Sequence, residues 1–466
     1  MSGQSVYELD AIEFARINYF FPLRSGCCCR APCLTMRFIA DLHIHSLYSR
    51  AASKNSHLRS LAAWARIKGV HLLGTGDFTH PLWFRELEET LKPAEPGFFQ
   101  LKEGLPPDFP LALHFGSSLQ SLSTRFVLSA EISSIYKRHG KVRKVHNLIF
   151  VPDFASAERI NKTLAAIGNL AADGRPILGL DSRDLLEIVL EKAPGGFLVP
   201  AHIWTPWFSM FGSRSGFDSL EECFGDLSSH IFALETGLSS DPAMNRLVSA
   251  LDSFTLISNS DCHSPGKLGR EATIFDTTFD FFAMKAALQA PCDASGHRHL
   301  AATIEFYPEE GKYHHDGHRL CGFCCDPYKS RELHNLCPVC GKPMTIGVLS
   351  RVLDLADRQA PMFPPGCPDV YSLIPLQEIL AELLGVGPGT KRGMNTYLQL
   401  IQQFGPELTI LIETPLAELS SADVPLLAEA IGRIRQNKVL RKAGFDGEFG
   451  SIKVYKESKG RLQGKI

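Results

Sequence analysis

The alternation of β-rich apolar runs with helical stretches, from residue 36 to about residue 290, most constrains the fold of this chain. Parallel strands need crossover connections, and strands separated by helices produce this alternation. A (β/α) barrel is the economical fold. Helices are expected at Leu58–Lys68, Ser156–Leu170 and Asp181–Lys192. Strands are expected at Phe38–His45, Val70–Gly76, Phe126–Ile132, His146–Val151, Phe197–Ile203, Ile231–Gly237, Thr255–Ser260 and Ala272–Phe275.

Histidine and acidic residues recur at the ends of these expected strands. In a (β/α) barrel the carboxyl ends of the strands meet at one face, where the active site is built. His43 and His45 close the first strand, and the two-residue period of a strand places them on the same side. The candidate metal ligands are His43, His45, Asp77, Glu131, His146, His202, Asp261 and His263.

These side chains have the chemistry of a multinuclear metal site. One zinc ion takes about four ligands, and imidazole with carboxylate suits zinc or manganese. We therefore expect two or three divalent ions, Zn, Mn or Mg. Such sites clamp both oxygens of a phosphoryl displacement, which favours phosphate ester hydrolysis. Glu131, Asp261 and His263 are the expected catalytic residues, with Glu131 as a bridging carboxylate.

Six short motifs, covering about residues 36–291, resemble the polymerase and histidinol phosphatase (PHP) superfamily. The resemblance implies a distorted (β/α) barrel with up to three metal ions. Two positions depart from the superfamily pattern: Ala51 replaces a third histidine, and Gly76-Asp77-Phe78 replaces Thr-Asp-His. Asp77 is the expected substitute ligand, with His80 as the alternative. The motifs are Asp41-Leu42-His43-Ile44-His45-Ser46, Gly74-Thr75-Gly76-Asp77, Ala130-Glu131-Ile132-Ser133, Lys144-Val145-His146, Pro200-Ala201-His202 and Ser260-Asp261-Cys262-His263.

Within this superfamily, the chain is similar to the endonuclease Q family from residue 36 to about residue 455. The similarity lies in Asp41–Arg50, Gly74–Pro81, His202–Phe208, Ser258–Glu271 and the cysteine unit described below. It implies a DNA repair endonuclease that cuts on the 5′ side of a deaminated base, such as uracil, hypoxanthine or xanthine, or of an abasic site. Damaged DNA is then the expected partner, and recruitment by a sliding clamp or another repair factor is left open.

Two Cys-x2-Cys pairs predict a structural zinc site. They are separated by 12 residues, the spacing of a closed four-cysteine site that leaves no position for water. The expected ligands are Cys321, Cys324, Cys337 and Cys340. Cys325 competes with Cys324 for this role. A thiolate could also be replaced by His314, His315, His318 or His334.

The chain divides into four expected parts. Residues 1–35 show no clear period, and we expect a disordered extension or a misassigned start before Met36. The barrel occupies 36–300, the zinc-binding unit 301–346, and a mainly helical domain 347–466. In that domain, Leu376–Leu384 and Met394–Phe404 have apolar residues at helical spacing. Its end is basic, with ten Lys or Arg against three acids from Ile431 to Ile466.

Several side chains near the candidate ligands could contact DNA. A nuclease that acts beside a damaged base must hold that base between apolar or aromatic walls. Trp204, Trp207 and Phe208 follow His202 and could form a wedge or pocket wall, although loop aromatics also simply pack. A second group, Lys267 and Arg270, could bind phosphate or form a surface ion pair.

Composition narrows the remaining possibilities. With 48 basic and 50 acidic residues the chain has no global basic field, so nucleic-acid binding must rest on local patches. Thirteen cysteines without a recognisable secretion signal predict a reducing compartment, and we expect a cytoplasmic protein without membrane spans. Two alternative functions remain: a small-molecule phosphatase of the histidinol phosphatase type, and a metal-bound DNA-binding adaptor without catalysis.

Overall fold

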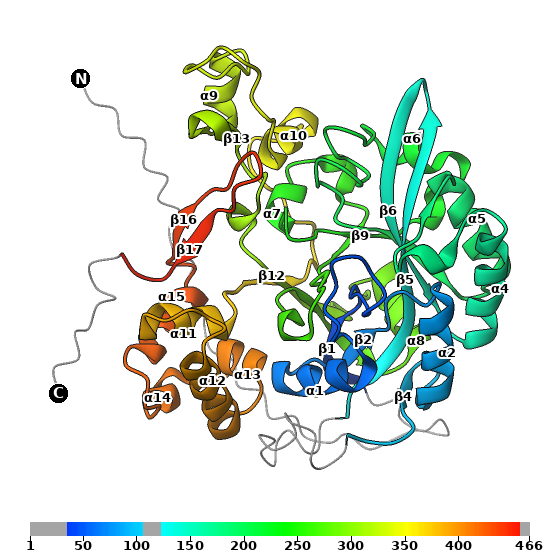
Figure 1. Ribbon diagram of the computed structural model, residues 1–466, viewed down its shortest axis with the longest axis horizontal. Coiled ribbons are helices and arrows are strands. Elements are labelled where there is room, and N and C mark those ends of the chain that lie inside the picture. Colours follow the sequence, from blue (N-terminus) through cyan, green and yellow to red (C-terminus); the bar gives the residue numbers. More distant parts are fainter. Residues whose placement is uncertain (1–34, 106–122, 457–466) are drawn as a thin grey trace. The chain divides into compact units, whose positions relative to one another are not determined.

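The structure is a computed structural model that describes residues 35–105 and 123–456 (Figure 1). The extension predicted for residues 1–35 lies outside the described residues apart from Thr35, as does the basic tail beyond residue 456. Among the described helices, none combines the length and apolarity needed to cross a bilayer.

A mixed central sheet of 11 strands organises the chain. Its strands are β1 (Thr35–Asp41), β2 (Leu72–Gly74), β3 (Leu91–Pro93), β4 (Phe99–Leu101), β5 (Arg125–Arg138), β6 (Lys141–Val151), β7 (Ile177–Leu178), β8 (Phe197–Pro200), β11 (Ala272–Thr278), β12 (Leu300–Glu305) and β15 (Asp369–Ser372). The order is β15-β12-β11-β1-β2-β5-β4-β3, and β6 joins β5 to β8. The expected parallel pairing holds for β1, β2 and β5, whereas β1–β11, β5–β6 and β6–β8 are antiparallel.

The long hairpin of β5 and β6 corrects the predicted ends of two strands. A two-residue turn at His139 and Gly140, both with positive φ, joins the strands, as tight hairpins require. The predicted runs stop at residue 132 and resume at residue 146, so Glu131 and His146 lie inside the hairpin rather than at strand ends. His146 pairs with Ser133, which shares a face of β5 with Glu131. Both side chains therefore point to one face.

Single hydrogen bonds connect the ends of the remaining strands. Strands β9 (Ala233–Glu235) and β10 (Thr255–Ile257) form a parallel pair. Ile203 N donates to Glu235 O, and Thr236 N donates to Ile257 O. The loop after β1 closes this series, because His45 N donates to Cys262 O at 3.0 Å. The segments that follow β1, β8, β9 and β10 are thus held together.

Helices cover the sheet with regularly spaced apolar residues. In helix α8 (Phe281–Gln289), Phe281, Met284 and Leu288 belong to the same buried cluster as Phe38 and Leu72 of the sheet. The other helices of this part are α1 (Leu58–Lys68), α2 (Pro81–Thr90), α4 (Phe154–Ala165), α5 (Ser182–Lys192), α6 (Leu220–Phe224) and α7 (Pro242–Asn245).

The predicted helix at Leu58–Lys68 is confirmed residue for residue as α1. His57 Nδ1 accepts a hydrogen bond from Ser60 N at its start, and Gly69 ends it with φ of 85°. Helix α5 begins one residue later than predicted, because Asp181 is its N-cap. The predicted helix at 156–170 is shorter, since α4 ends at Ala165 and a separate turn covers 170–172.

The predicted domain boundary at residue 300 falls inside β12. This strand pairs with β11 on one side and with β15 on the other, so both later parts of the chain extend the central sheet. The described residues, 35–105 and 123–456, accordingly belong to one compact unit. The later helices, a group of which lies at the lower left of Figure 1, are α9 (Pro327–Glu332), α10 (Val348–Leu355), α11 (Leu376–Leu384), α12 (Lys391–Phe404), α13 (Glu407–Ile412), α14 (Leu416–Leu419) and α15 (Leu427–Arg435).

A buried ion pair ties the C-terminal helices to α1. Lys68 Nζ lies 2.6 Å from Glu407 Oε2, and both side chains are almost fully buried. Tyr397 donates its hydroxyl hydrogen to the same oxygen, and Leu376 N donates to Oε1. Because both carboxylate oxygens are satisfied, the charge of Glu407 is compensated despite its burial.

Candidate metal centre

Four side chains from three segments form a first group that can hold a metal ion. They are His43, His45, Glu131 and Asp261. The Nε2 atoms of the two histidines lie 3.2–3.4 Å from Glu131 Oε2 and 3.1–3.6 Å from Asp261 Oδ1. Ligands about 2.0–2.2 Å from a tetrahedral ion are roughly 3.3–3.5 Å apart. The spacing therefore suits one ion at their centre.

The hydrogen bonding of this group also fits a metal. His43 Nε2, His45 Nε2 and Asp261 Oδ1 are buried without a hydrogen-bond partner among the described residues. Buried polar atoms without partners cost free energy unless another ligand satisfies them. All three atoms point into the same group. A cation bonded to each of them would remove this cost.

Glu131, His146 and His202 form a second group. Glu131 Oε1 lies 2.6 Å from His146 Nδ1 and 3.1 Å from His202 Nε2. The first group uses the other oxygen of the same carboxylate, so Glu131 can bridge two ions. Three protein ligands leave a coordination position open, which is the arrangement of catalytic rather than structural sites.

Acceptors behind three histidines orient their rings toward the two groups. The Nδ1 of His43 donates to the Glu235 carboxylate at 3.0 Å, and the Nδ1 of His45 donates to Asp77 at 3.1 Å. His202 Nδ1 donates to Thr205 Oγ1, also at 3.1 Å. In each ring the Nε2 lone pair then faces the metal group, as in carboxylate–histidine–metal triads.

Asp77, one of the predicted ligands, lies behind His45 and outside both groups. Its Oδ2 accepts hydrogen bonds from Ser46 N, Ser46 Oγ and Ser49 Oγ, and its Oδ1 faces His45. Both oxygens are therefore occupied. The predicted alternative, His80, stacks on Tyr48 and also lies outside both groups.

His263 lies beside the first group but is not a member of it. Its ring centroid is 4.4 Å from that of His45, and its Nδ1 faces the backbone oxygen of Asp261. The side chain is 30% exposed, whereas His43 and His45 are buried. His263 is thus positioned to meet a substrate or a further ligand at the opening of the site.

The electrostatics of the site favour a bound cation. Burial alone would lower the pKa of His43, but Glu235, followed by Glu131, outweighs it and raises this pKa well above its usual value. Burial lowers the pKa of His146 to about 4, which keeps this imidazole neutral and able to bind a metal. Burial alone would raise the pKa of both carboxyl groups, but Arg175 and His146 beside Glu131, and His43 and His45 beside Asp261, hold these pKa values below the usual range.

Two bonds position the loop that carries Asp261. Asp41 accepts a hydrogen bond from Ser260 N, and Arg270 Nε donates to Ser260 O. Asp261 itself has a φ of 45° and His202 a φ of 30°, a region that costs about 1–3 kcal/mol outside glycine. Gly237, at φ of 63°, packs against His202 so closely that an added Cβ would lie 2.4 Å from its Cβ. The surrounding packing enforces these strained conformations.

Two buried acids behind the site give the protein a predicted pH response. Burial raises the pKa of Glu305 to about 8, and the pKa of neighbouring Glu271 is raised as well. The unfolded carboxyl titrates near 4.5. Stability is therefore lost as pH rises from about 4.5 to 8, because only the unfolded chain ionises freely.

We expect Glu305→Gln to remove this loss. The amide keeps an acceptor for Thr236 Oγ1, which donates to Glu305 in the structure. Relative to wild type, its melting temperature should be similar at pH 5 and higher at pH 8, corresponding to roughly 1–3 kcal/mol. Thermal melts of the metal-loaded protein measure this, with exposed Glu158→Gln as control. A difference that does not change with pH would contradict the assignment.

Three of the four predicted zinc-unit cysteines come together. Cys321, Cys337 and Cys340 form a group with His318, and Cys340 Sγ lies 3.4 Å from His318 Nδ1. Cys324 is not part of this group, whereas His318, one of the predicted replacements for a thiolate, is. Strands β13 (Asp316–His318) and β14 (Phe323–Cys325) pair so that His318 faces Phe323, and Cys324 projects from the opposite face.

The predicted aromatic contacts with DNA divide into two kinds. Trp204 is fully buried and donates its indole N–H to Asn245, so it is a core residue. Trp207 is 40% exposed and packs edge-on against Tyr313, which precedes the zinc group. Phe208 covers His146, with a ring-centroid distance of 4.8 Å. Of the three, Phe208 contacts a residue of the metal groups, and Trp207 is the exposed one.

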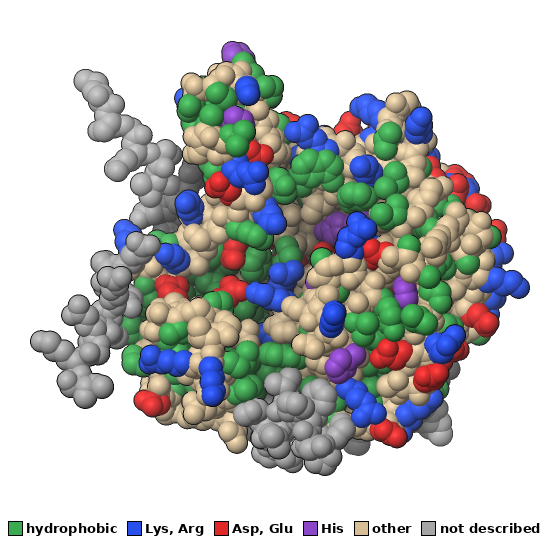
Figure 2. Space-filling model, in the orientation of Figure 1, with side chains coloured by type: hydrophobic (Ala, Val, Ile, Leu, Met, Phe, Trp, Pro, Cys, Tyr) green, Lys and Arg blue, Asp and Glu red, His purple; other side chains and the backbone are tan. Residues whose placement is uncertain are grey.

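The predicted phosphate contacts are already engaged. Lys267 forms an ion pair with Glu378 of α11 at 2.9 Å, and Arg270 supports the Ser260 backbone. On the face shown in Figure 2, Lys and Arg side chains border a recess in which a histidine is visible.

Two functional candidates escaped the sequence analysis. Glu235 ends β9 and therefore satisfied the strand-end criterion that identified the other residues. Arg175 donates to Glu131 Oε2 at 2.9 Å from a loop before β7, where no sequence pattern marks it. Spatial proximity alone reveals it.

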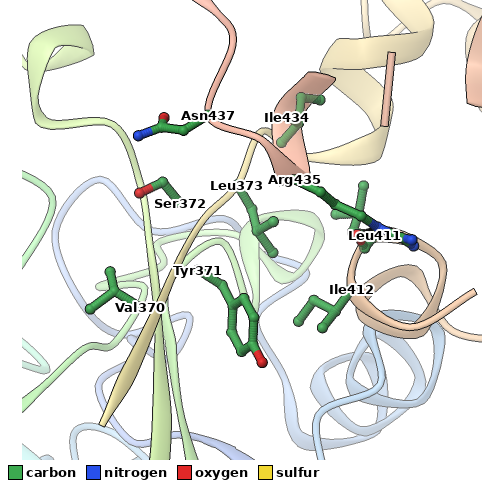
Figure 3. Close-up of a pocket in the computed structure, with 9 residues that line it drawn as sticks. All are labelled: Val370, Tyr371, Ser372, Leu373, Leu411, Ile412, Ile434, Arg435 and Asn437. Carbon is green, nitrogen blue, oxygen red and sulfur yellow. Dashed lines mark hydrogen bonds between the residues drawn. The ribbon is translucent and has the colours of Figure 1, made fainter. Parts of the chain in front are cut away.

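A separate cavity of about 210 Å³ lies among β15, α13 and α15 (Figure 3). Arg435 projects beside it, but its guanidinium donates to the backbone oxygens of Ile410, Leu411 and Thr414. No residue of the metal groups lines this cavity. The Arg435 side chain thus holds α15 against α13.

Comparison with known proteins decides the family. The crystal structure of the lesion-specific endonuclease PfuEndoQ from Pyrococcus furiosus is similar with a TM-score of 0.77 and 31% identity, covering 92% of this chain and 98% of that one. The chain belongs to the endonuclease Q family. An endonuclease Q complex with a 27-mer duplex carrying an abasic lesion at its active site matches with a TM-score of 0.76 and 31% identity, covering 92% of this chain and 99% of that one. As a member of the endonuclease Q family, the chain is a metal-dependent endonuclease.

Other relatives extend this family. The uncharacterized protein YqxK of Bacillus subtilis is 31% identical over 430 residues, which is 90% of this chain and 99% of YqxK. The uncharacterized protein MJ0043 of Methanocaldococcus jannaschii is 32% identical over 260 residues, 53% of this chain but only 31% of MJ0043. Residues 375–438 match the MJ0043 C-terminal domain. The helices α11 to α15 of this chain therefore lie within a recognised domain family.

Proposed function

We propose that this protein is a DNA repair endonuclease that hydrolyses the phosphodiester on the 5′ side of a deaminated base or an abasic site. The observation that carries the proposal is the Glu131 carboxylate, whose two oxygens face two separate metal-holding groups. Two adjacent ions suit an in-line phosphoryl displacement. Membership of the endonuclease Q family, which includes a complex with abasic-site DNA, supports the substrate.

We assign the first ion to His43, His45, Glu131 and Asp261, and the second to Glu131, His146 and His202. When bound, the pair of ions supplies an activated water and neutralises charge on the reacting oxygens. Glu235 and Asp77 hold the ring orientations of the first group. Asp77 is thereby a positioning residue in this proposal.

The fold around the site supports a DNA substrate. We infer that the central sheet and the β9–β10 pair make up a distorted PHP-type barrel, with the proposed ions between the β5–β6 hairpin and the segments that follow β1, β8 and β10. His318, Cys321, Cys337 and Cys340 would hold one structural zinc next to it. Trp207 contacts Tyr313, so the zinc unit and the aromatic edge of the site form a continuous surface that could receive a displaced base.

A cleavage assay tests the proposal. Purified protein is incubated with Mn²⁺, Mg²⁺ or Zn²⁺ and end-labelled duplexes that carry uracil, hypoxanthine, xanthine, an abasic site or no lesion. We expect a single cut on the 5′ side of each recognised lesion and none in the unmodified duplex. His43→Ala should abolish the cut, while exposed His230→Ala should retain it, which excludes a contaminating nuclease.

Other outcomes identify the alternatives. Binding to lesion DNA without cleavage under every metal would indicate an adaptor. Release of phosphate from small monoesters, with intact DNA, would indicate a phosphatase of the histidinol phosphatase type. Equal cleavage of duplexes with and without a lesion would overturn the repair function but not the nuclease activity.

A further inference from the structure

Arg175 lies at the junction of the two metal-holding groups. Its Nη1 donates to Glu131 Oε2 at 2.9 Å, the oxygen that faces the first group. The side chain is 26% exposed, unlike that of Glu131, which is 1% exposed. The guanidinium therefore spans from the buried carboxylate to the opening of the site.

Most donors of this guanidinium are uncommitted. Among residues 35–105 and 123–456, Glu131 is the one acceptor that its side chain reaches within hydrogen-bond distance. A guanidinium has five N–H donors arranged in a fork that matches two oxygens of a phosphate. Arg175 therefore presents unused donors on its exposed side, next to the atoms that would hold the ions.

The structure offers a reason for a positive side chain at this position. Asp77 is the predicted ligand for a further ion, but both of its carboxylate oxygens form hydrogen bonds, with Ser46, Ser49 and His45. The described residues form two groups at the site rather than three. A phosphodiester held by two ions still has a non-bridging oxygen to which the reaction adds charge, and a fixed cation there stabilises that charge.

Resting on the proposed function, the geometry points to Arg175 as a catalytic residue that binds a non-bridging oxygen of the scissile phosphate, in place of a third metal ion. The loop before β7 positions Arg175. Its backbone N donates to Asp173 Oδ1. The preceding residue, Gly174, packs so tightly on Asp77 that an added Cβ would lie 2.4 Å from Asp77 Oδ2. The loop that carries Arg175 thus packs on Asp77, the acid that orients His45, while the guanidinium itself is held by Glu131.

The test compares Arg175→Met and Arg175→Lys with Arg159→Met, an exposed arginine of α4. Bound barrel metal is measured by elemental analysis, folding by thermal melts, and chemistry by single-turnover cleavage of abasic-site DNA. We expect wild-type metal content and a rate lower by about 10²- to 10³-fold in Arg175→Met. Arg175→Lys should recover part of the rate, because it keeps the charge without the fork.

Two results would overturn the assignment: an unchanged rate in Arg175→Met, or a loss of metal that accounts for the slower rate. The same variants are also assayed on bis(p-nitrophenyl) phosphate, a phosphodiester without a base. If wild-type protein hydrolyses this ester but not lesion DNA, the repair function fails while the arginine assignment is still tested. A rate loss on both substrates supports the assignment.

Discussion

Replacing Glu131 by Gln is expected to abolish DNA cleavage and to empty at least one of the two proposed metal positions. The amide offers a single oxygen, and its nitrogen cannot take the place of the second ligand oxygen. The carboxylate faces His45 with one oxygen and His146 with the other. We therefore expect a rate loss of roughly 10³-fold or more, because water activation depends on the paired ions.

Metal content and single-turnover cleavage are measured together in this experiment. Glu89→Gln is a matched control, since Glu89 is an exposed acid of α2 far along the chain from the ligands. We expect the control to keep wild-type metal content and activity. Full occupancy of both ions in the Glu131 variant, with normal cleavage, would refute the bridging role.

His318→Ala is expected to release the structural zinc, whereas Cys324→Ser should retain it. His318 belongs to the group with Cys321, Cys337 and Cys340, while Cys324 projects from the other face of the hairpin. Structural zinc sites contribute about 10–16 kcal/mol in small peptides, so losing one ligand should unfold the local segment.

Zinc content per chain and limited proteolysis between residues 313 and 346 report the result. In His318→Ala, zinc should fall by about one ion per chain and the segment should become cleavable. Cys324→Ser is the control with a matched chemistry. If it, rather than His318→Ala, lost the metal, the four-cysteine set would be correct and the group seen in the structure would not be the zinc site.

Strand-end position accounts for most of the site that the sequence predicts. His43, His45, His202 and Asp261 follow strands β1, β8 and β10 within a few residues, so their convergence depends on strand periodicity and connection order. Helix α1 was predicted to the residue because its cap and its terminal glycine are local signals. Local signals of this kind are visible without the tertiary structure.

The failures have a common physical origin in pairing across the chain. Glu131 and His146 were placed at strand ends, whereas a hairpin runs through both positions. Only the register of β5 against β6 shows that they share a face. Asp77, which follows a strand and is predicted as a ligand, accepts three hydrogen bonds at Oδ2 and lies outside the two groups.

The sequence by itself determined that imidazoles and carboxylates gather at one face and that a cysteine-rich unit follows, because ligand chemistry and strand periodicity are local properties. The tertiary structure alone decided which atoms meet. It places Glu131 in both groups, His318 rather than Cys324 beside the other three cysteines, and Arg175 at the shared carboxylate. Such choices depend on strand register and loop packing over distances of a few ångströms, which no spacing along the chain encodes.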